Sequence, residues 1–444
     1  MDSLTPSVML VLLLAWPAFA VVMAAVATAL SPRPGRADSG GRDYWIVIPA
    51  LNEAKVIART VQAALALDST RAPVHVLVVD DGSDDATAEV LRGIDDPRLH
   101  VIRRDYPQAR QGKGAALNAG YRAVRDWALE HERVETTILA VIDGDGQCPP
   151  DVIRDVVDDY FADPGVGGLQ CRVRIRNRQR LLGLLQDLEF SCVANASQSF
   201  RDLVDSVGLG GNGQFIRLRE LMRFGDEPWS DCLVEDLELG LRLHLAGVRI
   251  RYSSAAVVDQ QAIVHIRRLL RQRARWAQGN LQCARHLRSL GRSRRVGSLG
   301  LVDYLAYLIP PWLAAPMSVA VAGAVSLVLA GLTTGNSLGG LIATGHAVPG
   351  AVGIWVSMIF LPGLIWAVWH RWKLGDEPLW RCLLAGLVYP LFLMLAVLAT
   401  WRGLARHLSG RDNWVKTERH DEIRTREATP DPINAGLSSS TLPK

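Results

Sequence analysis

Short apolar runs alternate with amphipathic stretches between residues 45 and 142, and this alternation constrains the fold more than any other feature. The apolar runs are rich in Val and Ile, as in strands that are buried on both faces of a sheet. Such strands, alternating with helices, predict a doubly wound α/β sheet. The expected strands are Trp45 to Pro49, Val74 to Val79, Leu99 to Arg103 and Thr136 to Ile142, and the expected helices are Val56 to Leu67, Asp84 to Arg92 and Lys113 to Trp127.

Polar residues follow the expected strands, at the edge where ligands bind in sheets of this kind. A Rossmann dehydrogenase is the competing α/β fold, and it requires GxGxxG after the first strand. Pro-Ala-Leu-Asn-Glu stands there instead, so the sequence disfavours a nicotinamide enzyme. The polar residues at this edge are Asn52, Asp80, Asp81, Asp143 and Asp145.

Charge and cysteine content narrow the class of protein. The chain has 444 residues and a formal net charge of +4, too small to indicate a nucleic-acid partner. Basic residues gather at 172–180 and 267–295, beside apolar segments, which fits anionic headgroups or phosphates, although solvated faces are the structural alternative. The 6 cysteines have neither CxxC nor zinc spacing, so we expect buried, reduced thiols in a cytosolic domain.

An apolar, uncharged stretch from Val8 to Leu30 is long enough to cross a bilayer, which takes ~20 residues. No basic region precedes it, which favours a retained helix over a signal peptide. Arg33, Arg36 and Arg42 follow it, so the positive-inside rule places the large domain in the cytosol.

Three further apolar stretches lie towards the C-terminus, and their number conflicts with the charges that follow them. If all four stretches span, the tail lies outside, yet its basic residues between 402 and 419 indicate the inside. This conflict leaves open that one of the stretches is re-entrant or interfacial instead of spanning. The stretch that contains Tyr389-Pro390 is the first candidate, because it has a proline in its middle. The three stretches are Tyr304 to Leu332, Val348 to Trp369 and Cys382 to Trp401.

Acidic motifs carry the candidate chemistry. Asp143-Gly144-Asp145 follows a buried strand and offers the carboxylate oxygens that Mg²⁺ or Mn²⁺ prefers when bridging nucleotide phosphates. Glu235-Asp236 opens an amphipathic helix, where one carboxylate can act as a general base or, alternatively, only complement the helix dipole. At Asp80-Asp81 a carboxylate can accept hydrogen bonds from a nucleobase and a ribose. The alternative role of this pair is to cap the next helix, but Ser83 or Asp84 can fill that role instead.

Two further segments suit a phosphate or a sugar. Lys113 lies among glycines and can supply a point charge to a diphosphate, or can simply begin a solvated helix. Residues 210–214 place three glycines around Asn212, as for a close approach to an acceptor sugar or a simple turn.

A helix is expected from Ile263 to Leu290, and three functional side chains share one of its faces. They offer a hydrogen-bond partner for a sugar, a cation that can stabilise the departing diphosphate, and a flat aromatic surface for a sugar ring. The alternative is an interfacial amphipathic helix with a tryptophan anchor. These side chains are Gln272, Arg275 and Trp276.

Taken in this order, the motifs resemble those of the membrane-bound family 2 glycosyltransferases, the group of cellulose, chitin, hyaluronan and poly-N-acetylglucosamine synthases, from about Trp45 to Arg419. The resemblance implies a GT-A-like mixed sheet, Asp143 and Asp145 as ligands of Mg²⁺ or Mn²⁺, and Asp236 as the base. Val234 replaces the Thr of the family's Thr-Glu-Asp motif. The residues after Asp145, from Gln147 to Pro150, are more similar to polyprenyl-phosphate sugar transferases.

The resemblance also implies roles for residues around the donor and the acceptor. Asp81, with Asp80 as the second choice, would contact uracil, and residues 414–419 resemble a gating loop, with a disordered tail as the alternative. The remaining implied donor-site residues are Pro49, Glu53, Lys113 and Asp143, and the implied catalytic residues are Asp236, Glu235, Gln272, Arg275 and Trp276.

We therefore expect a multi-pass inner-membrane enzyme with five parts: an N-terminal transmembrane helix and linker (1–42), a cytosolic GT-A-like domain (43–260), an interfacial helix (261–300), a C-terminal transmembrane region (301–401) and a cytosolic tail (402–444). It would transfer a sugar from a UDP-sugar, with inversion, to a growing polysaccharide that it extrudes. The alternatives are transfer of one sugar to a polyprenyl phosphate or lipid, and a non-catalytic nucleotide sensor. Membrane lipids are expected partners and nucleic acid is not; donor sugar, linkage and any accessory subunit stay open.

Overall fold

The structure is a computed structural model, and it describes most of the central part of the chain. The expected gating loop and most of the expected first span lie outside the described residues. The described residues are 18–26, 28–29, 41–68, 73–313, 316, 318–319, 323, 326 and 347–411, with side chains in the last range from 359 onwards.

A seven-stranded mixed sheet forms the centre of the domain, in the order β3-β2-β1-β4-β6-β5-β7. The first four strands pair in parallel, whereas β6 runs antiparallel to both β4 and β5. β5 and β7 pair in parallel at the far edge. The strands are β1 (Asp43–Ala50), β2 (Val74–Asp80), β3 (Leu99–Arg103), β4 (Thr137–Val141), β5 (Val166–Ile175), β6 (Gln214–Arg217) and β7 (Arg249–Gln260).

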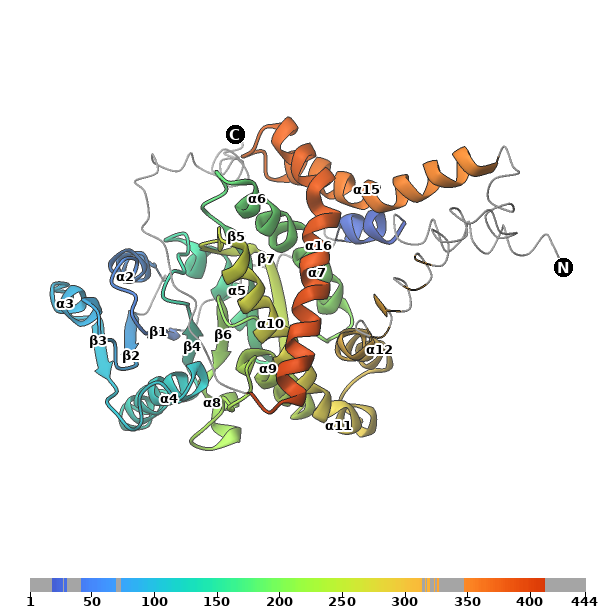
Figure 1. The fold of residues 1–444 in the computed structure, drawn as a ribbon. Helices are drawn as coiled ribbons and strands as arrows, with labels where there is room; N and C mark the ends of the chain where they lie inside the picture. The colour runs from blue at the N-terminus through green and yellow to red at the C-terminus, as the bar shows by residue number, and fades with distance from the viewer. Residues whose placement is uncertain are drawn as a thin grey trace, which may run out of the picture.

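Helices cover both faces of this sheet, as Figure 1 shows. Side chains of β1 alternate between the two layers: Tyr44, Ile46 and Ile48 join the apolar cluster under α2, while Trp45 and Val47 join the cluster under α4. This burial on both faces explains the unbroken apolar run. The helices up to β7 are α2 (Ile57–Leu65), α3 (Thr87–Arg92), α4 (Lys113–Glu130), η1 (Ile153–Val157), α5 (Asp158–Phe161), α6 (Leu181–Leu188), η2 (Glu189–Ala194), α7 (Asn195–Leu203), α8 (Leu218–Leu221), η3 (Met222–Phe224) and α9 (Glu235–Leu245).

The expected strands and helices of the first half are confirmed, with ends that shift by a few residues. The expected helix from Ile263 to Leu290 is broken: α10 (Ile266–Cys283) continues through the 3₁₀ turn η4 (Ala284–His286) into α11 (Leu287–Arg292). All six cysteines are buried and free, as predicted.

The C-terminal part contains two long helices that form an antiparallel hairpin, α15 (Ala347–Lys373) and α16 (Leu379–Leu408). They cross at a glycine contact, where a Cβ on Gly386 would lie 2.6 Å from the carbonyl oxygen of Gly363. Figure 1 shows α16 running along the domain that contains the sheet, beside α6 and α10, while the shorter α12 (Ser298–Leu308) lies near the lower end of α16. Among the helices whose side chains the structure describes throughout, α16 is the one long and apolar enough to cross a membrane.

Candidate active site

Lys113 lies in the first turn of α4, and its ammonium group is surrounded by carboxylates. Nζ is 2.6 Å from Oδ1 of Asp143, in the loop after β4, and 3.8 Å from Oε1 of Glu235, at the start of α9. Burial alone would lower the pKa of Lys113, but Asp143, Glu235 and Asp236 outweigh it, so the pKa rises above its ordinary value. The cluster therefore keeps a fixed positive charge at the carboxyl edge of the sheet.

The antiparallel strand β6 brings the glycine-rich segment 210–214 to this edge. Because β6 runs against β4, its first residue pairs with the last residue of β4. The amide of Gly213 donates to the carbonyl of Val141 at 2.9 Å, and the side-chain oxygen of Asn212 accepts the amide of Asp143 at 3.1 Å. The segment thus fixes the backbone that carries Asp143.

Gly211 lies directly against the carboxylate of Asp236. Its φ of +76° is in the left-handed region, and a Cβ there would lie 2.4 Å from Oδ2 of Asp236 and 3.0 Å from Nζ of Lys113. A side chain at this position would displace the groups of the cluster. The requirement for glycine is therefore both conformational and steric.

Glu235 and Asp236 differ in burial and in their hydrogen bonds. Glu235 is buried, and burial followed by the charge of Asp236 raises its pKa to about 7. Burial also raises the pKa of Asp236, while Lys113 and Arg275 oppose the rise. Oδ1 of Asp236 accepts the amide of Leu237 at 2.8 Å. Asp236 is the partly exposed member of the pair, which makes it the better placed to reach a ligand.

The two acids of the Asp-Gly-Asp motif point to different surroundings. Asp143 faces Lys113 with a quarter of its side chain exposed, whereas Asp145 is fully buried. Oδ2 of Asp145 accepts the amide of Gln261 at 2.9 Å, and its carbonyl accepts Arg176 at the same distance. Asp143 therefore belongs to the cluster around Lys113, and Asp145 connects the loop to the β5–β7 side of the sheet.

A divalent cation fits the donor chemistry of this edge, since Asp143 offers the hard oxygen ligand that Mg²⁺ and Mn²⁺ prefer. In the part of the chain that the structure describes, no three His, Cys, Asp or Glu side chains form a metal-binding group. Diphosphate oxygens and water would then supply most of the ligands.

Asp80 and Asp81, at the end of β2, both bind arginines. Asp80 pairs with Arg103 at 2.7 Å and accepts the amide of Ser83 at 2.9 Å in the turn after β2. The helix α3 begins only at Thr87, whose amide donates to Asp85 at 2.9 Å, so the helix-capping role expected of Ser83 or Asp84 falls to neither. Asp81 pairs with Arg104 at 2.5 Å. Burial raises the pKa of Asp81, with Arg104 opposing.

Glu53 and Pro49 lie at the end of β1, beside the motif after β4. Glu53 is buried, and its Cγ would be 2.9 Å from a Cβ on Gly144. Its amide donates to Oγ1 of Thr87 at 2.8 Å. Pro49 pairs with Val79 of β2 and is half-buried. Both residues thus line the edge where the sequence places the nucleotide.

The face of α10 predicted to be functional reaches the cluster through Arg275. This guanidinium donates to the carbonyl of Leu233 at 3.2 Å and lies close enough to lower the pKa values of Glu235 and Asp236. Trp276 lies under Arg273, whose guanidinium carbon is 4.8 Å from the ring centroid. Gln272 is half-buried on the same helix.

Sequence reasoning missed several residues that hold this site together. Arg103 ends β3 and Arg104 follows it, and only the parallel pairing of β2 with β3 reveals that they face Asp80 and Asp81. Arg176, at the end of β5, is another. Its partners come from distant parts of the chain, so a single sequence carries no local signal for it.

Comparison with known proteins identifies the family of this chain. The profile of the family described as Glycosyltransferase like family 2 matches residues 42–279, more than half of the chain. This protein belongs to that family.

Two curated relatives illustrate the range of the family. A beta-monoglucosyldiacylglycerol synthase of Synechocystis sp. is 32% identical over 242 residues, covering 53% of this chain and 47% of that protein. A poly-beta-1,6-N-acetyl-D-glucosamine synthase of Staphylococcus aureus is 27% identical over 235 residues, covering 52% and 53%. The chain thus spans about half the length of the curated relatives that it matches.

Among solved structures, the mannosyltransferase PcManGT from Pyrobaculum calidifontis, solved with GDP-Man and Mn²⁺, has a TM-score of 0.53 at 20% identity. The match covers 83% of this chain and 98% of that one. At this identity the likeness concerns the fold, and it confirms the expected GT-A-like α/β domain with a mixed sheet.

Proposed function

We propose that the protein transfers one hexose, with inversion, from a UDP-sugar to the hydroxyl of a membrane lipid. The contact that carries this proposal is the approach of Gly211, Lys113 and Asp236, because it places a cation and a partly exposed carboxylate side by side at the sheet edge. Mg²⁺ or Mn²⁺, when bound at Asp143, would supply charge neutralisation to the diphosphate.

Asp236 is the general base of this reaction. The acceptor oxygen attacks the anomeric carbon from the face opposite the diphosphate, and its proton passes to Asp236 as the new bond forms. The bond between the anomeric carbon and the diphosphate oxygen breaks, and UDP departs with that electron pair. Lys113, beside Asp143, and Arg275, beside Glu235 and Asp236, would supply the positive charge that stabilises the leaving group.

The residues around β1 and β2 would hold the nucleoside. Asp81 accepts the uracil imide and Asp80 maintains the turn, while Pro49 and Glu53 form the adjoining wall. Arg104 must release Asp81 for this contact, since the two side chains are paired. Gln272 and Trp276 on α10 would then face the acceptor.

A lipid acceptor is favoured over a polymer by the packing of α10 against α16. A Cβ on Gly403 would lie 2.9 Å from the carbonyl oxygen of Ala274, and Arg406 donates to the buried Gln278 at 2.9 Å. The two helices touch backbone to backbone at this crossing, which leaves no room there for a chain of sugars. Processive synthesis with extrusion is the second candidate, supported by the complete Gln-x-x-Arg-Trp motif and the poly-N-acetylglucosamine synthase relatives.

The membrane is the proposed place of action, with the domain on the cytosolic face of the inner membrane and the stretches 8–30, 304–332 and 348–369 as its spans. Exposed apolar residues on the described helices support contact with lipid.

Product size separates the two candidates. Full-length protein in lipid vesicles is incubated with labelled UDP- and GDP-sugars, and the lipid extract and aqueous phase are sized by chromatography. We expect UDP release with a single labelled sugar on lipid; long water-soluble chains would establish the polymerase instead. No nucleotide release with any donor would contradict both.

A further inference from the structure

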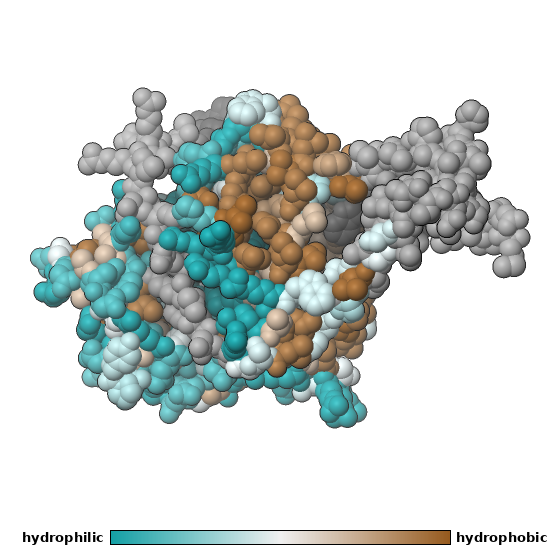
Figure 2. Space-filling view, viewed as in Figure 1, coloured by the Kyte–Doolittle hydropathy of each residue, from teal (hydrophilic) through white to brown (hydrophobic). Residues whose placement is uncertain are grey.

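The helix α16 carries an exposed apolar stripe along its whole length. The stripe residues recur every three or four positions, so they share one face of the helix. The opposite face, with Ala385, Tyr389 and Phe392, is buried in an apolar cluster that α6 shares with the end of α15 and with residues 20–24 of the N-terminal stretch. Figure 2 shows hydrophobic surface along α16 in the same view as Figure 1. The stripe consists of Trp380, Leu384, Leu387, Leu391, Met394, Leu398, Trp401 and Leu408, which are 41–74% exposed.

The first end of α16 is bound to the transferase domain by an ion-pair network. Arg381 donates to the carbonyl of Arg178 at 2.6 Å and to that of Gln179 at 3.0 Å, in the segment between β5 and α6. In the turn before α16, Asp376 pairs with Arg174 of β5 at 2.6 Å.

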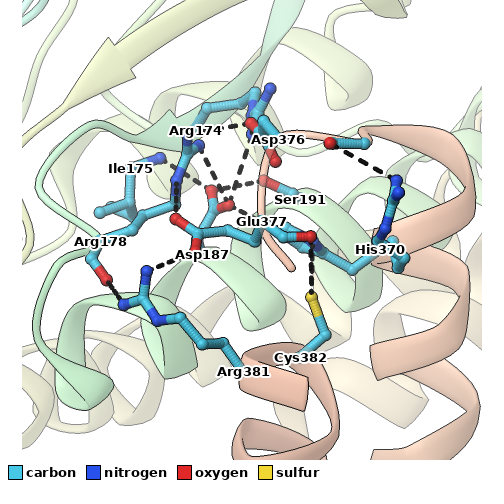
Figure 3. A network of polar contacts seen from close by, with 12 residues as sticks. Arg174, Ile175, Arg178, Asp187, Ser191, His370, Asp376, Glu377, Arg381 and Cys382 are labelled. Atoms are coloured by element: carbon cyan, nitrogen blue, oxygen red, sulfur yellow. Dashed lines mark hydrogen bonds and ion pairs between the residues drawn. The ribbon is translucent and has the colours of Figure 1, made fainter. Parts of the chain in front are cut away.

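The buried carboxylate of Asp187 on α6 lies at the centre of this network, as Figure 3 shows. It accepts a hydrogen bond from Ser191 at 2.7 Å and contacts His370, at the end of α15, at 2.8 Å. Arg174 and Arg178 lie 3.5 and 3.4 Å from it. The turn between α15 and α16 is thus fixed to the domain that holds the nucleotide site.

The last turns of α16 are bound to the same domain. Arg406 donates to the side-chain oxygen of Gln278 on α10, and Gly403 packs on the backbone of Ala274. A helix of 30 residues is ~45 Å long, so the two anchored ends are far apart. Both ends nevertheless contact one folded domain, and they must lie on the same side of any bilayer.

We propose that α16 lies in the plane of the membrane, with its apolar stripe in the lipid and its buried face on the transferase domain. Length and composition would also allow α16 to span. Spanning, however, would carry α6 or α10 into the hydrocarbon together with the charges of Asp187, Arg174 or Arg273. Each such charge costs ~3 kcal/mol or more at the centre of a bilayer.

Charge at the end of the stripe identifies the lipid surface. Arg402 and Arg411 are exposed beside Trp401, and with Arg406 they border a cavity of about 340 Å³. Basic residues next to an apolar helix face fit an anionic headgroup, and tryptophan favours the interfacial depth. A bilayer containing anionic lipid therefore matches this face better than a second copy of the chain.

The in-plane position also removes the conflict in the charge pattern. With stretches 8–30, 304–332 and 348–369 as spans, the chain returns to the side of the domain before α16 begins. The basic residues after Trp401 then lie on that side too, as the positive-inside rule requires.

Labelling of both helix ends tests the topology. Single cysteines are introduced in the full chain as Leu379→Cys, Ser409→Cys and, as a reference on α4, Glu130→Cys; all three positions are exposed and the native cysteines are buried. Sealed vesicles of each orientation are treated with a membrane-impermeant maleimide. We expect all three sites to react from one side. Reaction of positions 379 and 409 from opposite sides would overturn the proposal.

The depth of the stripe provides the second test. Nitroxides are attached at Leu384→Cys, Leu391→Cys and Leu398→Cys in vesicles of phosphatidylcholine with phosphatidylglycerol, and Leu129→Cys, exposed on α4, is the aqueous control. An in-plane helix places the three labels at one depth, ~5–10 Å below the headgroups. A label at 391 much deeper than its neighbours, or three labels without lipid contact because a second copy or another segment covers them, would refute it.

Neither readout uses a sugar donor. Failure here would therefore leave the proposed transfer reaction standing, and failure of the transfer reaction would leave the position of α16 untouched.

Discussion

The ammonium of Lys113 lies 2.6 Å from the carboxylate of Asp143, and this ion pair joins the start of α4 to the loop that follows β4. The carboxylates of Glu235 and Asp236 reach the same point from α9. Gly211, one of the three glycines in the segment 210–214, sets how closely these groups approach one another.

Substitution of Gly211 by Ala should disable the site while the fold persists. The new Cβ would lie 2.4 Å from Oδ2 of Asp236, so the carboxylate must move by an ångström or more. A misplacement of this size lowers kcat by on the order of 100-fold. Gly225→Ala is the matched control, because Gly225 has a similar φ of +72° but nothing within 4 Å of its Cβ position. Equal activity losses in the two variants would contradict the steric role.

Arg275→Gln should move the pH dependence of the reaction. Arg275 lowers the pKa values of Glu235 and Asp236, so its removal raises both. A base must be deprotonated to act, and the acid limb of kcat/KM therefore shifts to higher pH, with reduced activity below neutrality. Arg275→Lys keeps the charge and should leave the limb in place. An unchanged profile in the Gln variant would separate Arg275 from the acidic pair.

Asp143→Asn should weaken the use of metal. The substitution replaces a charged carboxylate by a neutral amide, which binds a divalent cation more weakly. We expect the Mn²⁺ or Mg²⁺ concentration for half-maximal UDP release to rise about tenfold or more, equivalent to ~1.4 kcal/mol. Asp95→Asn, an exposed aspartate before β3, is the control. A chelator should abolish the wild-type activity. Full activity in its presence would contradict a metal-dependent donor site.

Asp187→Asn should destabilise the protein, by about 3–5 kcal/mol at neutral pH, since it removes the fully buried carboxylate that Arg174, Arg178 and His370 share. The two arginines then keep only Asp376 and Glu377, in the turn before α16, as acidic partners. Burial would raise the pKa of Asp187, but Arg174 and His370 outweigh it and hold the pKa well below its ordinary value. The stabilisation is therefore present above about pH 4 and is lost as pH falls.

Thermal unfolding in detergent at neutral and acidic pH checks this expectation. The exposed Glu89, paired with Arg92 on α3, supplies the control Glu89→Gln, which should change stability by less than ~1 kcal/mol. A melting temperature of Asp187→Asn equal to that of the wild type at neutral pH would show that the network adds nothing.

The parallel half of the sheet could be predicted because its strands are apolar on both faces and its helices are periodic. The acids after these strands could be placed for the same reason, since parallel strands end at one edge. The resemblance implied a mixed sheet, but the strands of its antiparallel half were not located: β6 has only 4 residues, and β5 and β7 mix Arg, Gln and Ser with apolar residues. Their pairing is decided by tertiary contacts, as with the bond from Gly213 to Val141.

The long-range contacts of the site could not be read from the sequence either. Arg104 on Asp81 and Arg176 on the carbonyl of Asp145 depend on strand order rather than on spacing. For α16 the sequence indicated apolar length, while the basic residues after it and Tyr389-Pro390 left open that this stretch does not span. The contacts that anchor its two ends, from Arg381 to Gln179 and from Arg406 to Gln278, join residues far apart in the sequence and therefore leave no local signal.

Acceptor-dependent UDP release by Asp236→Asn, measured beside UDP binding, tests the central claim most directly. Asn keeps the size of the side chain and its hydrogen bond to Leu237 but cannot take a proton. The account predicts UDP affinity within a few-fold of wild type and a loss of transfer on the order of 10²- to 10⁴-fold. Transfer at the wild-type rate in Asp236→Asn would contradict it.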